Sequence, residues 1–331
     1  MAECVRVALA GCGGLGRTHA RNVEAMEGVR LVAVCDVVGE SAAQLAAQLA
    51  SGPQPYTDHR AMLAAENPDA VLVVTPNHTH SRIGTDAALA GAHVFCEKPM
   101  ALTVGDCDAM IRAAEQSGVY LMIGYVLRFQ AVYMEMKRRV DRGDIGEITL
   151  AHAVRLGTGA PGGVGGWQTR RETYGGMFSM YSHELDQLAW LAGEIHAVNA
   201  VMKYGEDQEN EVEESIFIGI EFASGAIGSL SSSRVYPVNS YELGVAGTNG
   251  ALKLNAPGGP ITFARHGGSS ASIEVPGNNG LVDEIAHFIG CIQRGNAPRS
   301  DGSDGRRVVA VALAAHESAR TGKRVEVPMM T

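Results

Sequence analysis

Short apolar runs alternate with stretches of helical period over the first 125 residues. Runs rich in β-branched residues predict strands at Val5–Ala10, Val29–Cys35, Ala70–Thr75, His93–Cys96 and Val119–Ile123. The stretches between them predict helices at Leu15–Met26, Ser41–Ala50, His80–Ala90 and Val104–Ser117. Short apolar strands separated by helices are typical of a parallel sheet covered on both faces. The pattern therefore predicts a doubly wound βαβ domain over residues 1–125.

The pattern changes after Tyr125, where strands begin to follow one another. Helices are predicted over Gln130–Arg142 and from about Ser182, with a Gly-rich segment from Gly157 to Gly166 between them. Strand-like runs lie at Ile148–Val154, Ile195–Lys203, Glu214–Glu221, Ala226–Ser233 and Tyr241–Ala246, and closing helices at Leu281–Gln293 and Ser303–Ser318. Successive strands joined by Ser-Gly and Asn-Gly turns indicate a mostly antiparallel sheet. We therefore predict an α/β protein with an N-terminal Rossmann domain (1–125) and a C-terminal α+β domain (126–331) that carries a large open sheet.

Charge and composition exclude several classes of function. The formal net charge of −9 and the lack of a Lys/Arg cluster argue against a nucleic-acid partner. No apolar stretch approaches the ~20 residues that span a bilayer, and Val5–Gly11 is too short for the core of a signal peptide. Six scattered cysteines without a C-x-x-C pair indicate free, apolar thiols rather than disulfides. We expect a cytoplasmic protein without a membrane partner.

A glycine-rich turn follows the first predicted strand. Gly11-Cys12-Gly13-Gly14-Leu15-Gly16 matches G-x-G-x-x-G and opens a predicted helix. In this context Gly11 permits a tight turn, Gly13 lets the backbone approach a pyrophosphate, and Gly16 allows close packing of helix on strand. The free N–H groups of the helix N-terminus favour phosphates. The sequence predicts a dinucleotide site.

The second strand ends at Asp36, twenty residues beyond Gly16. An acidic residue at this place accepts hydrogen bonds from the hydroxyls of the adenosine ribose. Its charge would repel a 2′-phosphate, and Val37 and Val38 supply no cation to receive one. The sequence therefore favours NAD over NADP.

Two further motifs end predicted strands. Thr75-Pro76-Asn77-His78-Thr79-His80 follows one, and Glu97-Lys98-Pro99 follows the next. Ligands of open parallel sheets bind at the carboxyl ends of strands, so both turns should face the cofactor. His78 and His80 stand two residues apart with no nearby Cys or acid, so we predict no metal site there.

These motifs resemble the Gfo/Idh/MocA oxidoreductases, named for glucose–fructose oxidoreductase and inositol dehydrogenase. The resemblance covers nearly the whole chain. Besides the motifs above, it rests on Gly124-Tyr125 through Arg128-Phe129, Gly175-Gly176, Ser182-His183-Glu184-Leu185-Asp186 and the segment around Asp283-Glu284-Ile285. It implies hydride transfer between NAD and a secondary alcohol or ketone of a sugar, cyclitol or related polyol.

The resemblance also implies roles for single residues. Lys98 resembles the lysine that stabilises negative charge on the reacting oxygen, and His183 the acid/base histidine. Glu97 looks like a contact of the nicotinamide ribose. Thr75, Pro76 and Asn77 look like the wall beside the nicotinamide, and His80 is expected to begin a helix beside the cofactor. The expected cofactor contacts are Gly11, Gly13, Gly14, Leu15, Gly16, Asp36, Thr75, Pro76, Asn77, His80, Glu97 and Lys98.

The chain departs from the family at Ser179, where many members have Asp four residues before the histidine. A serine hydroxyl can hold a substrate hydroxyl but cannot act as a carboxylate. Asp186, one turn beyond His183, is a candidate to orient the imidazole or to serve the fold. The expected substrate contacts are Lys98, Arg128, Trp167, Gln168, Ser179, Tyr181 and His183, with the Gly-rich loop either a lid or a surface connection.

Three classes of function fit this set of residues. The first is a dehydrogenase that exchanges NAD in each cycle, and the second a hydrolase or lyase that retains NAD and oxidises the sugar transiently. The third is a non-enzymatic sugar or NAD sensor, against which the retention of both Lys98 and His183 argues. One face of the second sheet needs cover, and in the family it commonly forms subunit contacts, so we expect a homodimer or homotetramer.

Overall fold

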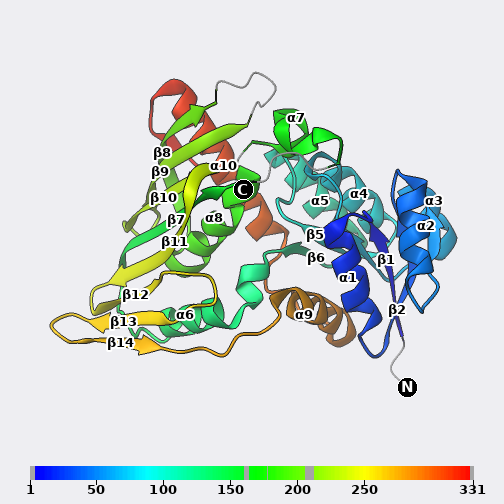
Figure 1. Ribbon diagram of the computed structural model, residues 1–331, viewed down its shortest axis with the longest axis horizontal. Coiled ribbons are helices and arrows are strands. Elements are labelled where there is room, and N and C mark those ends of the chain that lie inside the picture. Colours follow the sequence, from blue (N-terminus) through cyan, green and yellow to red (C-terminus); the bar gives the residue numbers. More distant parts are fainter. Residues whose placement is uncertain (1–3, 160–163, 177, 206–211, 329–331) are drawn as a thin grey trace. The chain divides into compact units, whose positions relative to one another are not determined.

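The computed structural model describes residues 4–159, 164–176, 178–205 and 212–328. Its contacts divide the chain into two units, residues 1–126 with 279–306, and residues 127–278 with 307–331. The predicted linear division after residue 125 did not include the return of 279–306 to the first unit. Each unit is described by itself below, with the labels of Figure 1.

The first unit holds a six-stranded parallel sheet in the order β3-β2-β1-β4-β5-β6. Its strands are β1 Val5–Ala10, β2 Val29–Cys35, β3 Gln54–Tyr56, β4 Ala70–Val73, β5 His93–Glu97 and β6 Leu121–Gly124. Its helices are α1 Gly14–Glu24, α2 Gly39–Ala47, α3 His59–Glu66, η1 Asn77–Thr79, α4 His80–Leu89, α5 Val104–Ser117 and α9 Gly280–Arg294. The strand order reverses between β1 and β4, which is where a doubly wound sheet binds its ligand.

Helix ends in the first unit follow from local chemistry, and α5 is an example. The Thr103 side chain accepts a hydrogen bond from the Asp106 N–H at 3.1 Å and donates to the Asp106 carboxylate at 2.7 Å. Gly118 ends the helix with a positive φ of 65°, a conformation that glycine adopts without steric cost. The helix therefore spans the predicted residues, Val104–Ser117.

The second unit holds a nine-stranded sheet in the order β14-β13-β12-β11-β7-β10-β9-β8-β15. Its strands are β7 Ile148–Thr158, β8 Ile195–Tyr204, β9 Glu213–Phe222, β10 Ile227–Ser233, β11 Val235–Gly247, β12 Gly250–Leu254, β13 Ile261–Arg265, β14 Ser270–Ile273 and β15 Val325–Glu326. Only β7 and β10 pair in parallel among the described strands; the other pairs are antiparallel. The predicted fold class is confirmed.

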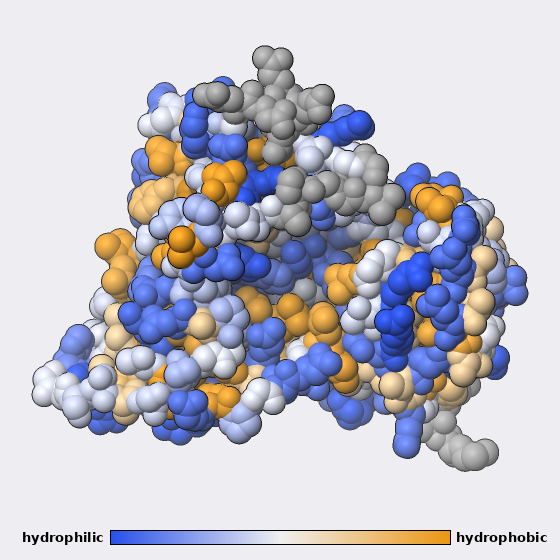
Figure 2. All heavy atoms as spheres, viewed as in Figure 1, coloured by the Kyte–Doolittle hydropathy of each residue, from blue (hydrophilic) through white to orange (hydrophobic). Residues whose placement is uncertain are grey.

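One face of this second sheet packs against helices and the other is open. The helical elements are η2 Val126–Phe129, α6 Ala131–Asp141, η3 Val164–Thr169, α7 Arg171–Tyr174, α8 Phe178–Ala192 and α10 Gly302–Thr321, which begins in the first unit. Helix α8 contacts β7, β10 and β11. Figure 2 shows orange, hydrophobic residues at the surface in the region of β8 to β10. No helix in the described part of the chain is long and apolar enough to cross a bilayer.

Candidate functional site

The glycine-rich turn between β1 and α1 has the geometry of a phosphate cradle. Gly11 adopts a φ of +101°, and a Cβ there would lie 2.1 Å from the Val74 carbonyl oxygen. A Cβ on Gly16 would lie 1.9 Å from the Gly11 oxygen, so only glycine fits either position. A Cβ on Gly13 or Gly14 would meet nothing within 4 Å, which leaves the backbone there accessible. Leu15 is exposed beside them.

Asp36 is oriented by the backbone around it. One carboxylate oxygen accepts a hydrogen bond from the Cys12 N–H at 2.8 Å, and the other accepts from the Val38 N–H at 2.9 Å. The carboxylate is thereby fixed at the carboxyl end of β2, beside the glycine turn. Together with the open first turn of α1, this arrangement fits the pyrophosphate and adenosine ribose of NAD.

We expect Asp36→Asn to weaken NAD binding about 10–100-fold, because the ribose hydroxyls lose a charged acceptor. The preference for NAD over NADP should narrow at the same time, since the charge that repels a 2′-phosphate is gone. Dissociation constants for NAD and NADP measured by fluorescence titration test this expectation. Asp58→Asn is the matched control, since Asp58 follows the neighbouring strand β3 by two residues but caps α3 through the Ala61 N–H. Unchanged NAD affinity in Asp36→Asn would contradict the assignment.

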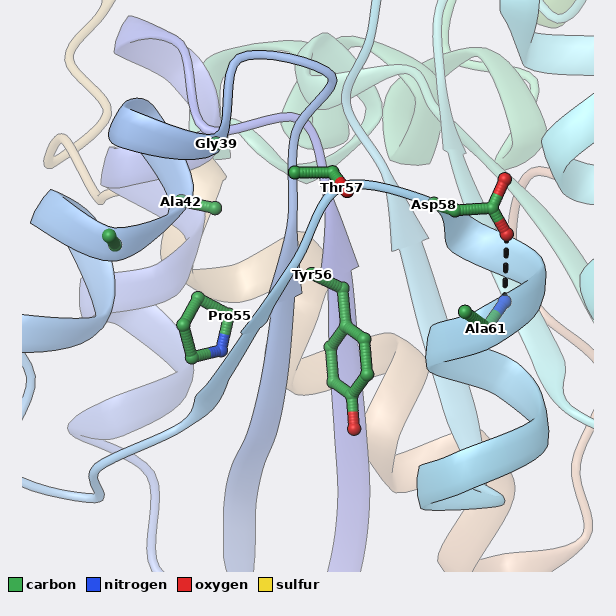
Figure 3. A pocket seen from close by; sticks show the side chains of 8 residues that line it. Gly39, Ala42, Pro55, Tyr56, Thr57, Asp58 and Ala61 are labelled. Carbon is green, nitrogen blue, oxygen red and sulfur yellow. Dashed lines mark hydrogen bonds between the residues drawn. The ribbon is translucent and has the colours of Figure 1, made fainter.

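A pocket lies at β3, the edge strand of the first sheet (Figure 3). It is lined by residues of α2, β3 and the start of α3, among them Gly39, Tyr56 and Ala61. None of the predicted site residues lines it. The cofactor site therefore rests on the glycine turn and not on this pocket.

The turn after β4 is tied to the turn after β5 by His80. The His80 ring is buried, with Nδ1 2.8 Å from the Pro99 carbonyl oxygen and Nε2 2.8 Å from the Thr75 carbonyl oxygen. Burial lowers the pKa of His80, and the two carbonyl oxygens only partly offset that effect. Each ring nitrogen thus faces a backbone carbonyl oxygen, and the neutral ring donates a hydrogen bond to one of them, so His80 packs between the two turns that are predicted to face the cofactor.

Thr75, Pro76 and Asn77 make up most of the turn after β4. The Thr79 hydroxyl lies 2.6 Å from the Thr75 hydroxyl and 2.7 Å from the Pro76 carbonyl oxygen. Asn77 is buried, while Thr75 and Pro76 are partly exposed. The turn is rigidified by its own side chains at the strand edge where ligands of this fold bind.

The turn after β5 presents Glu97 and Lys98. Glu97 is buried, with one carboxylate oxygen 2.9 Å from His19 Nε2 and the other accepting from the Lys98 N–H at 3.2 Å. Lys98 is partly exposed. Because β5 adjoins β4, and β4 adjoins β1, Lys98 stands on the same sheet edge as the glycine turn.

Helix α8 of the second unit carries three of the predicted substrate contacts. Ser179 and Tyr181 are buried, and His183 is partly exposed. Burial raises the pKa of Tyr181 well above its usual range, with the charge of Glu213 as the next cause. Tyr181 therefore faces the interior of its unit, whereas His183 has access to solvent.

Arg128 is held in a buried ion pair. Its guanidinium donates to both oxygens of the Asp186 carboxylate, with the shortest contact at 2.6 Å. It also lies over the Trp190 ring, 5.5 Å from the ring centroid, and Arg128 is only 3% exposed. This pair joins η2 to α8 one turn beyond His183, so it supports the backbone that carries the histidine.

Trp167 and Gln168 lie in η3 and are partly exposed. The Trp167 ring meets the Tyr174 ring edge-on with 5.5 Å between centroids, and its carbonyl oxygen accepts from the Thr173 hydroxyl at 2.6 Å. Residues 160–163 of the Gly-rich loop that was considered a lid lie outside the described residues.

These features define a class of protein, a nicotinamide-dinucleotide enzyme built on a doubly wound sheet. Residues 5–125 match the NAD-binding Rossmann fold of the Gfo/Idh/MocA oxidoreductase family, and residues 137–327 match the C-terminal alpha/beta domain of the same family. The chain therefore belongs to the Gfo/Idh/MocA family of oxidoreductases, as the motifs predicted.

Individual relatives cover nearly all or most of the chain. It is 29% identical to scyllo-inositol 2-dehydrogenase (NAD(+)) of Bacillus subtilis, over 98% of this chain and 97% of that one. It is also 29% identical to 2,7-anhydro-N-acetylneuraminate hydratase of Mediterraneibacter gnavus, over 76% of this chain and 68% of that one. The crystal structure of aldose-aldose oxidoreductase from Caulobacter crescentus, complexed with glycerol, has a TM-score of 0.86 at 30% identity and covers 97% of this chain and 99% of that one.

Sequence reasoning missed the surroundings of Glu97. His19 on α1 and Glu284 on α9 both lie beside it, and all three side chains are buried. The sequence indicates Glu284 only as part of the family pattern. The one signal for His19 was its place three residues after Gly16, on the face of α1 that packs inward.

Proposed function

We propose that this protein is an NAD-dependent dehydrogenase that transfers a hydride between the nicotinamide and a secondary alcohol or ketone of a sugar, cyclitol or related polyol. The observation that carries the proposal is the carboxyl edge of the first sheet, where the glycine turn, Asp36 and Lys98 follow strands β1, β2 and β5. The NAD specificity of the inositol dehydrogenase relative supports the cofactor.

We assign the proton chemistry to two side chains. When bound, NAD would supply the acceptor for the hydride that leaves the alcohol carbon. The Lys98 ammonium donates a hydrogen bond to the alcohol oxygen and stabilises its growing negative charge. The His183 imidazole accepts the hydroxyl proton in oxidation and returns it in reduction. The balance is one alcohol and one NAD⁺ giving one ketone, one NADH and one proton.

We assign the remaining substrate contacts by polarity and exposure. Gln168 and Trp167 are partly exposed, and the indole ring suits stacking on a sugar ring. The Ser179 hydroxyl is proposed to hold a substrate hydroxyl where many relatives carry a carboxylate. Arg128 and Tyr181 are both buried. We propose that they support the residues that contact the substrate.

The test is the absorbance of NADH when the purified protein is given NAD and a panel of sugars, glycosides and inositols, with products followed by chromatography. Growth of NADH in equal amount to the ketone supports the dehydrogenase. Loss of substrate without net NADH favours the second candidate, a hydrolase or lyase that retains its NAD; one relative is a hydratase and not a dehydrogenase by name. Binding of NAD and sugar without turnover would instead indicate a sensor.

We further propose that the enzyme is a cytoplasmic homodimer or homotetramer. The open face of the second sheet carries neighbouring apolar side chains, with Val201 beside Phe217 and Ile227 beside Leu150. Val201 is 64% exposed and Phe217 50%, so covering them with a second copy removes apolar surface from water. Sedimentation at micromolar concentration should give at least twice the 34.8 kDa of one chain, and a monomer would contradict the proposal.

A further inference from the structure

Three titratable side chains of the first unit meet in its interior. His19 comes from α1, Glu97 from the end of β5 and Glu284 from α9, and their ligand atoms lie within 4.8 Å of one another. His19 and Glu284 are fully buried and Glu97 is 7% exposed. Two carboxylates this close and this deeply buried cannot both be ionised without a large free-energy cost.

The hydrogen bonds divide the two carboxyl groups into different roles. Glu97 is bound at both oxygens, by His19 Nε2 at 2.9 Å and by the Lys98 N–H at 3.2 Å. Among the described residues, neither oxygen of Glu284 has a hydrogen-bond partner. Burial, and then the charge of Glu97, raise the pKa of Glu284 well above its usual range. The two carboxyl groups therefore differ in their surroundings: Glu97 has a partner at each oxygen, and Glu284 has none among the described residues.

Packing around the cluster leaves little freedom for these side chains. The Phe95 ring meets the His19 ring edge-on at 5.6 Å and the Phe288 ring of α9 at 5.9 Å. A Cβ on Gly124 of the neighbouring strand would lie 3.2 Å from the Glu97 carboxyl carbon. Helix α9 is also joined to α1 by a hydrogen bond from the Asn22 amide to the Leu281 carbonyl oxygen. The Glu284 carboxyl group is thus held with a ligand atom within 4.8 Å of one of Glu97.

We propose that Glu284 is a neutral carboxylic acid that donates a hydrogen bond to the Glu97 carboxylate and so positions Glu97 for the nicotinamide half of bound NAD. The inference rests on the proposed function, because it assumes that Glu97 contacts the cofactor. Glu284 is a positioning residue, since it acts through Glu97. Among the described residues, the titratable groups placed against it are His19 and Glu97, and Glu97 in turn interacts with Lys98 and His80.

A divalent cation is the competing occupant, since two carboxylates and an imidazole are common metal ligands. The 2.9 Å hydrogen bond between His19 Nε2 and Glu97 favours the proton, because it already uses one nitrogen of the ring and one oxygen of the carboxylate. A proton on Glu284 also neutralises one of the two carboxylate charges, and it requires no ligand from outside the protein.

The first experiment measures NAD and NADH dissociation constants by fluorescence titration for two substitutions at this position. Glu284→Gln keeps a neutral side chain with an N–H donor, so its affinities should stay within about 3-fold of the wild type. Glu284→Leu has similar bulk and no donor, and should bind NAD about 10–100-fold more weakly. Equal weakening in both variants, or none in Glu284→Leu, would overturn the proposal.

The second experiment measures the Tm of the cofactor-free protein from pH 5 to pH 9. The unfolded chain releases the glutamate proton near pH ~4.3, whereas the folded protein retains it to higher pH. The wild type therefore loses stability as the pH rises through this window, and Glu284→Gln does not. The Tm advantage of Glu284→Gln should widen with pH, while Glu317→Gln, at an exposed residue of α10, should run parallel to the wild type.

A constant difference in Tm between the wild type and Glu284→Gln from pH 5 to pH 9 would show that Glu284 is ionised. A wild-type Tm that falls with EDTA and recovers with Zn²⁺ or Mn²⁺ would assign the cluster to a metal. Either result overturns the proposal. Neither experiment uses a polyol substrate. Both therefore still test the cluster if the protein oxidises no polyol. A wild type that fails to bind NAD would refute the proposed function instead, and the pH profile of the Tm would still decide the protonation of Glu284.

Discussion

Lys98→Met should lower kcat about 10²–10³-fold, the range found when one donor to a developing oxyanion is removed. Methionine keeps the unbranched stem and removes only the ammonium group. The substitution also keeps the backbone N–H of residue 98, which donates a hydrogen bond to the Glu97 carboxylate at 3.2 Å, so the turn after β5 should retain its shape. The dissociation constant for NAD should change little, because the glycine turn and Asp36 are untouched. Steady-state kinetics and NADH titration of the same preparation measure both quantities.

Two further variants sharpen this test. Lys98→Arg keeps the charge but replaces a compact ammonium by a planar fork, and should recover only part of the lost turnover. Lys137→Met on α6, where the ammonium pairs with Asp141 one helical turn away, should leave kcat unchanged. Wild-type turnover in Lys98→Met would remove the lysine from the proposed chemistry. A loss of NAD affinity as large as the loss of kcat would make it a cofactor-binding residue instead.

The predictable part of the fold is the part with strong local signals. All five strands predicted in the first unit are present, because each is a run of buried apolar residues. The three-residue strand β3 and the helix α3 after it went unpredicted. A strand of three residues has no measurable period, and α3 is set mainly by its cap, Asp58.

Tertiary packing changed several boundaries in the second unit. Helix α8 begins at Phe178, before the predicted start near Ser182. Ser179 and Ser182 have modest helix propensity, but both are buried on a helix that packs against the sheet. Strand β11 begins at Val235 although Pro237 interrupts its pattern, and its pairing with β7 shifts register between Val235 and Ser240. Local patterns do not report such long-range contacts.

The residues of the candidate site also divide into those that local sequence predicts and those that only long-range packing brings together. The glycine turn and Asp36 have fixed spacing within one βαβ unit, so the sequence predicts them together. The cluster of His19, Glu97 and Glu284 joins positions that lie far apart in the chain, and Glu284 reaches it only because residues 279–306 return to the first unit. The helical period places Glu284 on the buried, apolar face of α9 with Ile285 and Phe288, but it does not show which side chains meet the acid there.

His183→Ala should lower kcat about 10²–10⁴-fold, since the substrate proton loses its acceptor. Helix α8 should persist in this variant, because alanine favours helix and the Arg128–Asp186 pair one turn beyond holds the backbone. The dissociation constant for NADH should stay near the wild-type value. Stopped-flow measurement of the first turnover, with substrate deuterated at the oxidised carbon, separates hydride transfer from product release.

Added imidazole should restore part of the turnover in His183→Ala if the missing group is a proton acceptor. It should have no effect on Lys98→Met, where the proton acceptor is intact and the missing group is the ammonium that stabilises the oxyanion. His196→Ala, at an exposed histidine of β8, is the control for loss of a histidine as such and should keep full activity. Turnover near the wild-type value in His183→Ala would place the acid/base elsewhere.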